Sequence, residues 1–221
     1  NFYRPTQTIY YLIIHSIAGQ SEVAFHLGNL LLHLINALLV FLLIQKLFNN
    51  RQWACFTSFL WALHPTHTEA ITYVSGTADP MAFLFMFLAL LSFPYQRKNY
   101  YRWGLAICFF ILSLVSKESL IIGPGLFALC AFIKSKKPWS IKSYIQTIPF
   151  WILSFTYLSM RETILNFDGT YEFYKSSNIY TENIHYRIFT FLAALTEYVK
   201  ILFSPLNLHM ERHFPVYINF T

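Results

Sequence analysis

The feature that most constrains this chain is a series of apolar runs that contain almost no charged side chains. The runs cover residues 21–43, 48–63, 77–93, 100–115, 120–133 and 141–160, with a weaker run at 187–203. They are apolar nearly all round, whereas a surface helix of a soluble protein is apolar on one face only. Charged residues make up 12% of the chain, about half the share of an ordinary soluble domain. We therefore expect an all-α, polytopic helical membrane protein with about six transmembrane helices.

The basic residues are concentrated in alternate segments between these runs. Lys46 and Arg51, residues 97–102 and residues 134–142 contribute 9 of the 16 Lys and Arg but none of the 10 Asp and Glu. By the positive-inside rule these segments face the cytoplasm. The placement also argues against a nucleic-acid surface, despite a net charge of +6, because the basic residues do not form one patch with exposed aromatics. Most carboxylates then lie in segments that face the other side: residues 64–79, 116–119 and 161–186.

The two ends of the chain carry weaker signals. Residues 6–18 are too short to cross a bilayer and predict an interfacial helix. Residues 187–203 contain Glu197 and Lys200, so this run either crosses the membrane or lies in its interface. The chain opens inside a polar and aromatic stretch, and we expect residues 1–221 to be one partial membrane domain. Three cysteines lie inside apolar runs without paired spacing and are expected to be small core residues: Cys55, Cys108 and Cys130.

A polar stripe follows the first run. His26, Asn29, His33 and Asn36 are spaced by 3, 4 and 3 residues, which places them within about 80° of one helix face. Such a stripe is costly against lipid, so we expect it to face other helices or a wet cavity. Hydrogen bonds between helices and contact with a ligand are both open interpretations.

The densest polar cluster is His64-Pro-Thr-His67-Thr-Glu69. A helix over residues 51–63 would cover only about 20 Å of a ~30 Å hydrocarbon core. The His-Pro turn would then lie below the membrane surface, where irregular backbone needs a protein-lined or wet cavity. Thr66 and Glu69 also fit a local capping box. A metal site at His64, His67 and Glu69 lacks a recognised ligand spacing, and we expect no metal.

Three further segments carry candidate functional residues. Asp79 precedes a proline and could be a helix N-cap or a functional carboxylate. Lys117 and Glu118 are neighbours that should have separate partners, and Lys117 is either a phosphate ligand or a snorkelling side chain. The Gly-Pro-Gly at residues 123–125 predicts a kink or a break. The loop at 161–186 and the tail at 205–213 are polar and suit either solvation or a contact with substrate.

Taken in order, these segments resemble the membrane domain of class C glycosyltransferases, specifically bacterial relatives of the transmembrane and tetratricopeptide repeat-containing O-mannosyltransferases. The matching pieces are Tyr3-Arg4-Pro5, His26-Leu27-x-Asn29, His33-x-x-Asn36, Ala62-Leu63-His64-Pro65-x-His67-Thr68-Glu69-Ala70, Gly76-x-Ala78-Asp79, Ser116-Lys117-Glu118 and Pro205-Leu206-Asn207-Leu208. The fourth piece is fairly specific, and the others are weak when taken alone. Thr77 departs from the pattern, since relatives often carry Arg there.

The resemblance implies transfer of a mannose-like sugar from a polyprenyl-phosphate donor to a hydroxyl of a protein or glycan acceptor. It implies no cofactor, and a bacterial inner membrane with the site facing outward. It also implies that the first span, most of the first outward loop and the principal catalytic base precede residue 1. Two other classes stay open: a transporter or flippase of a lipid-linked sugar, and a non-catalytic membrane scaffold.

The resemblance and the polar clusters together assign roles to residues that are present. Glu69 and Asp79 are the candidate catalytic residues, which would position the acceptor or the sugar. His64 and His67 would form a polar wall. Lys117 and Arg4 would bind the carrier phosphate, Lys117 through a single ammonium charge and Arg4 through the paired N–H donors of its guanidinium group. Glu118 would orient the surroundings of Lys117.

Overall fold

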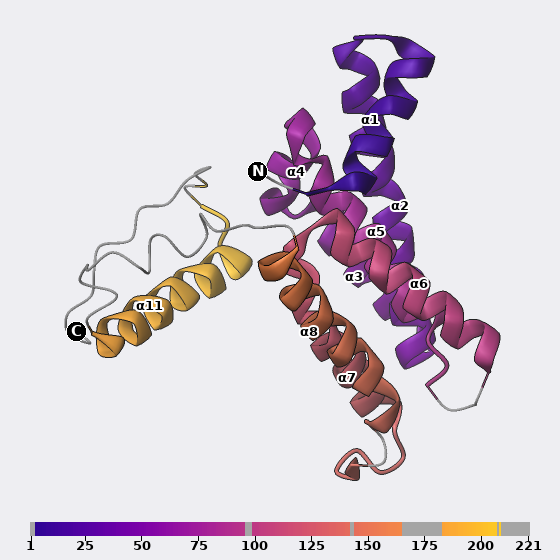
Figure 1. Ribbon diagram of the computed structural model, residues 1–221, viewed down its shortest axis with the longest axis vertical. Helices are drawn as coiled ribbons and strands as arrows, with labels where there is room; N and C mark the ends of the chain where they lie inside the picture. The colour runs from indigo at the N-terminus through magenta and orange to yellow at the C-terminus, as the bar shows by residue number, and fades with distance from the viewer. Residues whose placement is uncertain (1–2, 96–98, 142–143, 165–182, 207, 209–221) are drawn as a thin grey trace. The chain divides into compact units, whose positions relative to one another are not determined.

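The computed structural model describes residues 3–95, 99–141, 144–164, 183–206 and 208 (Figure 1). Helices dominate these described residues, and none of them lies in a strand, which confirms the all-α prediction. The chain divides into two compact units, Asn1–Thr163 and Ile164–Thr221. The single domain expected from the sequence stays a prediction.

The first unit consists of α-helices joined by short turns of 3-10 helix. The α-helices are α1 (Pro5–Ala18), α2 (Glu22–Phe48), α3 (Arg51–Leu63), α4 (Thr68–Thr72), α5 (Ala78–Ser92), α6 (Tyr100–Ser116), α7 (Gly123–Lys134) and α8 (Ile148–Thr163). The 3-10 turns are η1 (Pro65–His67), η2 (Val74–Thr77), η3 (Glu118–Ile122) and η5 (Ile145–Thr147). The second unit contains α11 (Ile184–Phe203), in which no residue is buried.

A two-residue turn of asparagines reverses the chain between α2 and α3. Asn49 ends α2 in the left-handed conformation with φ of 53°, which Asn tolerates better than most residues. The Oδ1 of Asn50 then accepts hydrogen bonds from the backbone N–H groups of Gln52 and Trp53 at 3.0 and 3.1 Å. Because Asn50 caps the next helix at once, α2 and α3 pack as an antiparallel pair.

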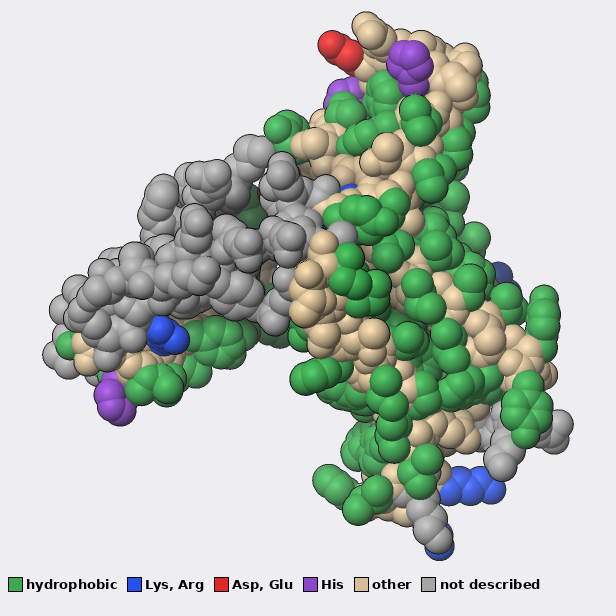
Figure 2. All heavy atoms as spheres, in the orientation of Figure 1, with side chains coloured by type: hydrophobic (Ala, Val, Ile, Leu, Met, Phe, Trp, Pro, Cys, Tyr) green, Lys and Arg blue, Asp and Glu red, His purple; other side chains and the backbone are tan. Residues whose placement is uncertain are grey.

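Helix α2 buries polar side chains and exposes apolar ones. Asn29 and Asn36 are fully buried and His33 nearly so, whereas Leu34 and Leu38 are 55% and 56% exposed. Hydrophobic side chains also cover much of the visible face of the first unit (Figure 2). An apolar exterior around buried polar groups is the arrangement expected in lipid, and it favours the bilayer as the surroundings of this helix.

Two helical segments, Glu22–Phe48 and Val74–Ser92, are long and apolar enough to cross a membrane, and Tyr100–Ser116 is apolar but shorter. The six spans expected from the sequence therefore stay a prediction. Helix α7 covers only 12 residues, or about 18 Å, because the chain before it is 3-10 and Pro124 stands in its first turn. The predicted break at residues 123–125 is confirmed at the start of α7.

The core of the first unit lies between α5, α6, α7 and α8. Met86, Phe93, Phe110, Phe127 and Phe150 are at most 1% exposed. The rings of Phe127 and Phe150 stack with centroids 3.9 Å apart, and Phe110 meets both edge-on. These aromatic contacts fix α7 beside α8, as Figure 1 shows.

Candidate functional site

A cavity of about 320 Å³ lies between the middle of α2, the end of α3, the start of α5, the residue after α6, the turn η1 and the short helix α4. Its polar lining consists of His33, Asn36, Thr66, His67, Glu69, Asp79 and Lys117, and Trp61 and Phe83 supply aromatic walls. The sequence predicts a cavity beside the His-Pro turn, and the structure confirms it. Which side of the membrane it faces stays a prediction.

The polar stripe of α2 forms one wall and ties the surrounding turns together. The Asn36 Nδ2 donates to the carbonyl of Pro80 at 2.7 Å, and the His33 Nε2 lies 2.9 Å from the carbonyl of Ala62. Above them, the Oδ1 of Asn29 accepts from the Thr77 hydroxyl at 2.8 Å. The inward direction predicted for the stripe is thus confirmed for these three residues.

The first member of the stripe, His26, is exposed, so the prediction is wrong there. Asn29 is reached by α1 and by η2, whereas His26 lies nearly one turn closer to the start of α2. Helical periodicity predicts which way a side chain points, but it does not predict whether a neighbouring segment extends far enough to bury that side chain.

Three rings pack together at the cavity wall. The centroids of His33 and Trp61 are 4.8 Å apart, those of Trp61 and His67 are 4.4 Å apart, and those of His33 and His67 are 5.4 Å apart. Burial lowers the pKa of His67 to about 4, with repulsion from His33 and His64 adding to the effect. His67 is therefore neutral near pH 7, where it can exchange hydrogen bonds but cannot act as a cation.

His64 plays a local role. Its Nδ1 lies 2.7 Å from the Thr66 hydroxyl and accepts from the Thr66 backbone N–H at 3.4 Å, so it caps the turn η1. It does not line the cavity. Its ring centroid is 6.2 Å from that of His67, which makes it a support for the polar wall.

Glu69 lies in the first turn of α4 and reaches the cavity. The predicted capping box is wrong, because α4 starts at Thr68, its N-cap His67 makes no side-chain cap, and Thr66 contacts His64 instead. Glu69 is exposed and makes no ion pair with any residue that the structure describes. Its carboxylate is thus available to a ligand.

Asp79 is bound to Lys117. The Lys117 Nζ lies 2.5 and 2.6 Å from the two carboxylate oxygens of Asp79, and both side chains line the cavity. The predicted N-cap role of Asp79 is wrong: Thr77 occupies the N-cap position and Asp79 is the second residue of α5. The full charge of Lys117, the residue that follows α6, offers this carboxylate a stronger partner than backbone N–H groups do.

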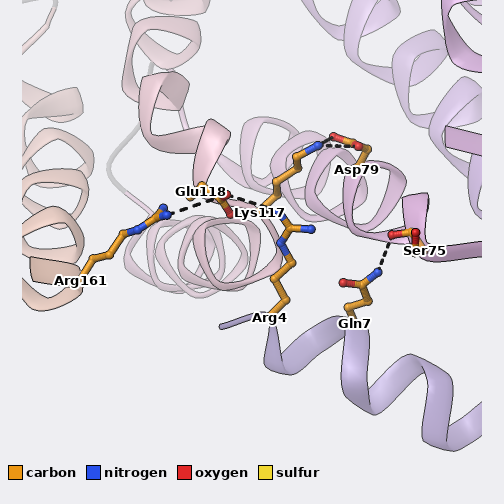
Figure 3. Close-up of polar contacts among 7 residues, drawn as sticks. All are labelled: Arg4, Gln7, Ser75, Asp79, Lys117, Glu118 and Arg161. Atoms are coloured by element: carbon orange, nitrogen blue, oxygen red, sulfur yellow. Dashed lines mark hydrogen bonds and ion pairs between the residues drawn. The ribbon is translucent and has the colours of Figure 1, made fainter. Parts of the chain in front are cut away.

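Glu118 points away from Lys117 and toward two arginines, as Figure 3 shows. The Arg4 guanidinium lies 3.3 and 3.4 Å from its two oxygens, and Arg161 at the end of α8 lies 4.0 Å away. The prediction of separate partners for Lys117 and Glu118 is confirmed. Burial alone would raise the pKa of Glu118, but backbone hydrogen bonding and the two arginines outweigh it, and the net pKa is lowered.

Helix α1 carries Arg4 to this position through further polar contacts. The Thr6 hydroxyl donates to the buried Ser116 hydroxyl at 2.8 Å. The Gln7 amide and the Tyr11 hydroxyl donate to the carbonyls of Ser75 and Val74, each at 2.8 Å. These bonds join α1 to the end of α6 and to η2, so α1 helps to fix both ion-pair clusters.

Four of the seven candidate site residues meet at the cavity: Glu69, Asp79, His67 and Lys117. Arg4 and Glu118 form a neighbouring cluster, and His64 supports the wall.

Sequence reasoning missed Arg161 as a partner of Glu118 and Trp61 as a wall residue. Trp61 lay inside an apolar run, so only its place at the end of that run could have singled it out. The candidate acids at positions 168, 172 and 182, and residues 209–213 of the tail, lie outside the described residues.

The chain is similar in sequence to known protein O-mannosyl-transferases. The chain is 31% identical over 131 residues to protein O-mannosyl-transferase Tmtc1 of Drosophila melanogaster, 38% over 96 residues to TMTC1 of Mus musculus, and 29% over 119 residues to F38B6.6 of Caenorhabditis elegans. These matches cover 58%, 43% and 52% of this chain but only 15%, 10% and 17% of the relatives. No solved structure matches the chain.

A family match covers the elements that build the cavity. Residues 8–160 match the family described as dolichyl-phosphate-mannose-protein mannosyltransferase. The matched range contains the stripe of α2, the His-Pro turn, Asp79 and Lys117. The chain therefore belongs to this family of mannosyltransferases, and it resembles the animal O-mannosyl-transferases named above.

Proposed function

We propose that this chain is part of a membrane-embedded transferase that moves mannose, or a closely similar sugar, from a polyprenyl-phosphate carrier to an acceptor hydroxyl. The observation that carries the proposal is the cavity in which Glu69 lies beside the Asp79–Lys117 pair. Family membership supports the class of reaction. The extracytoplasmic side is supported by the basic segments, which lie away from this cavity.

The two cavity carboxylates suit different tasks. The carboxylate of Asp79 is paired with Lys117, so it holds that cation in place at the cavity. Glu69 makes no ion pair with a described residue, and an ionised carboxylate accepts strong hydrogen bonds from hydroxyl groups. We assign Glu69 to the positioning of the acceptor hydroxyl or of the sugar.

The carrier phosphate needs cations at the moment of transfer. The acceptor oxygen forms a bond to the anomeric carbon of the sugar, the bond from that carbon to the phosphate oxygen breaks, and its electron pair leaves with the polyprenyl phosphate. The acceptor proton passes to the base. A fixed cation stabilises the negative charge that develops on the leaving phosphate, and Lys117 at the cavity is the first candidate.

A second group of cations stands next to this cavity. Arg4 and Arg161 both contact the carboxylate of Glu118, which orients the two guanidinium groups. Arginine offers several donors in a fork that matches phosphate oxygens. We therefore assign Arg4, together with Arg161, to the phosphate end of the donor, and Glu118 to holding both guanidinium groups in place.

A transporter of lipid-linked sugars is the competing class. Such a protein needs a polar path toward the opposite face of the membrane. Beyond Asn36, residues 37–44 of α2 are all apolar, so the polar stripe stops at the cavity. This observation favours transfer at one end of the helices over transport. The bacterial inner membrane expected from the sequence stays a prediction, because the relatives named above are animal proteins.

Sugar transfer from radiolabelled polyprenyl-phosphate mannose to an acceptor, catalysed by the whole protein, tests the proposal. Glu69→Gln and Lys117→Ala should each lower the rate of transfer at least tenfold. Glu22→Gln is the matched control, because Glu22 is an exposed acid in the first turn of α2 and does not line the cavity. Rates that stay unchanged in the first two variants, with normal folding, would contradict the assignment, and movement of the donor without covalent transfer would favour the transporter.

A further inference from the structure

A second cavity, of about 460 Å³, lies at the other end of the first unit. Three cations from three different helices line it: Lys46 of α2, Arg102 of α6 and Lys134 of α7. No acid is among its lining residues in the described structure. Lys46 stands ten residues beyond Asn36, about 15 Å further along α2. This cavity is therefore separate from the one that contains Glu69.

Two of these cations are held in place by the end of α5. The Lys46 Nζ donates to the carbonyls of Leu91 and Phe93 at 2.7 and 3.0 Å. The Arg102 guanidinium donates to the same Leu91 carbonyl at 3.0 Å. Carbonyls at a helix C-terminus attract cations, but together they amount to only about half of a negative charge. The two full positive charges thus exceed the charge that orients them.

The third cation, Lys134, lines the same cavity. Arg102 and Lys134 both repel the Lys46 ammonium group, so bringing these groups together around one cavity costs free energy. An anion placed among them would remove this cost. Arginine has five N–H donors, so the Arg102 guanidinium can bind further oxygen atoms beside its bond to the Leu91 carbonyl.

The remaining wall is aromatic. Phe93 and Tyr95 line the cavity, and the Lys46 ammonium lies 4.5 Å from the centroid of the Tyr95 ring. The Tyr95 hydroxyl donates to the Leu90 carbonyl at 2.8 Å, which fixes the ring. A cavity with cations on one side and rings on the other suits a phosphate group that is joined to an organic body.

We propose that this second cavity binds a phosphate group through Arg102, Lys134 and Lys46. The phosphate belongs to the headgroup of an anionic phospholipid or to a free phosphate ion. Lys and Arg side chains are visible at the lower end of the first unit in Figure 2, and basic segments beside a membrane attract anionic headgroups. The proposal does not depend on the transferase activity, since it concerns residues at the opposite ends of the helices.

Binding is measured on the whole protein in a neutral detergent, by titrating short-chain phosphatidylglycerol or inorganic phosphate and following the thermal unfolding midpoint. Lys134→Gln and Arg102→Gln should each raise the dissociation constant about tenfold, because each variant loses one charge-assisted contact. Lys136→Gln is the matched control, because it removes an exposed charge close to Lys134 that does not line the cavity. Lys46 is left unchanged, since it also caps α5.

Each outcome of the titration decides the question. Tighter binding of phosphatidylglycerol than of inorganic phosphate, weakened in both cavity variants but not in the control, identifies a lipid site. Equal binding of the two ligands with the same pattern of variants identifies a free-phosphate site. The proposal is overturned if neither ligand raises the unfolding midpoint, or if Lys136→Gln weakens binding as much as Lys134→Gln does.

Discussion

At the scale of single residues, the pair of Asp79 and Lys117 offers the most direct test of the site. Asp79→Asn leaves Lys117 charged beside the cavity. Because both side chains are partly exposed, the free energy of unfolding should change by no more than about 1 kcal/mol. The rate of sugar transfer should fall at least tenfold, since the lysine loses its fixed position. Transfer assays and thermal unfolding of the same preparations separate the two effects.

The chain contains a matched ion pair for comparison. Lys200 and Glu197 lie three residues apart on α11, and their contact is exposed. Glu197→Gln should leave both the transfer rate and the unfolding midpoint close to those of the parent protein. A loss of transfer in this control as large as in Asp79→Asn would show that the effect belongs to ion pairs in general and not to the cavity.

His67 makes the stability of the protein depend on pH. The pKa of His67 is about 4 in the folded chain and about 6.5 in an unfolded chain. Between these values the unfolded chain binds a proton that the folded chain does not, so acid favours unfolding. The free energy of unfolding should therefore fall as the pH is lowered from about 6.5 and level off below about 4.

Thermal unfolding at pH 7 and pH 5 measures this effect. The groups around His67 are His33, His64, Glu69, Asp79 and Lys117. His67→Gln should reduce the difference between the two midpoints. His26→Gln should keep the full difference, because His26 is exposed on α2. An equal pH dependence in the parent and in His67→Gln would rule out His67 as the source.

Residue roles were predictable from the sequence only where they depend on local geometry. The inward direction of Asn29, His33 and Asn36 follows from helical periodicity, and the structure bears it out. The N-cap interpretation of Asp79 also used a local rule, and it is wrong because Lys117, 38 positions away, binds the same carboxylate. The contact of Arg161 with Glu118 joins α8 to η3, and no spacing in the sequence indicates it.

At the scale of elements, the start of α7 is fixed where the backbone of Gly123 packs closely against the core side chains Met86 and Phe110. A Cβ atom at Gly123 would lie 2.3 Å from the Met86 Cε and 2.8 Å from the Phe110 Cε2. Gly123→Ala should therefore lower the free energy of unfolding by about 1 to 3 kcal/mol through overpacking. Thermal or denaturant unfolding in detergent checks this value.

The same helix supplies the control. A Cβ atom at Gly125 meets no atom within 4 Å, so Gly125→Ala should raise the free energy of unfolding by roughly 0.5 kcal/mol through the better helix propensity of alanine. Two variants that shift stability in the same direction would show that packing against α5 and α6 is not what restricts residue 123.

Element boundaries were predictable where the chain carries a clear signal. The double asparagine ends α2 and begins α3, and the Gly-Pro-Gly segment begins α7. The apolar run at 141–160 instead gives a helix that begins only at Ile148. Residues Ile145–Thr147 form the 3-10 turn η5 instead, with Thr147 buried and Ile145 exposed. The average hydropathy of a run does not show where a 3-10 turn ends and an α-helix begins.

At the scale of the whole molecule, the two cavities give the helices two chemically different ends. One end holds Glu69 and Asp79 and the other holds Lys46, Arg102 and Lys134. By the positive-inside rule, the end rich in Lys and Arg is predicted to face the cytoplasm. The transferase proposal requires the carboxylate end to face the opposite compartment, so membrane sidedness tests the architecture and the function together.

Single cysteines report this sidedness. In a protein with Cys55, Cys108 and Cys130 changed to alanine, Thr68→Cys marks the exposed start of α4 and Lys136→Cys marks the exposed basic end. A membrane-impermeant maleimide added outside sealed cells should label the first variant at once and the second only after permeabilisation. If Lys136→Cys reacted first, the carboxylate cavity would face the cytoplasm, and transfer on the extracytoplasmic side would be ruled out. If both reacted together, α5 to α7 would not separate the two ends across a bilayer, and the helices would lie on the membrane without crossing it.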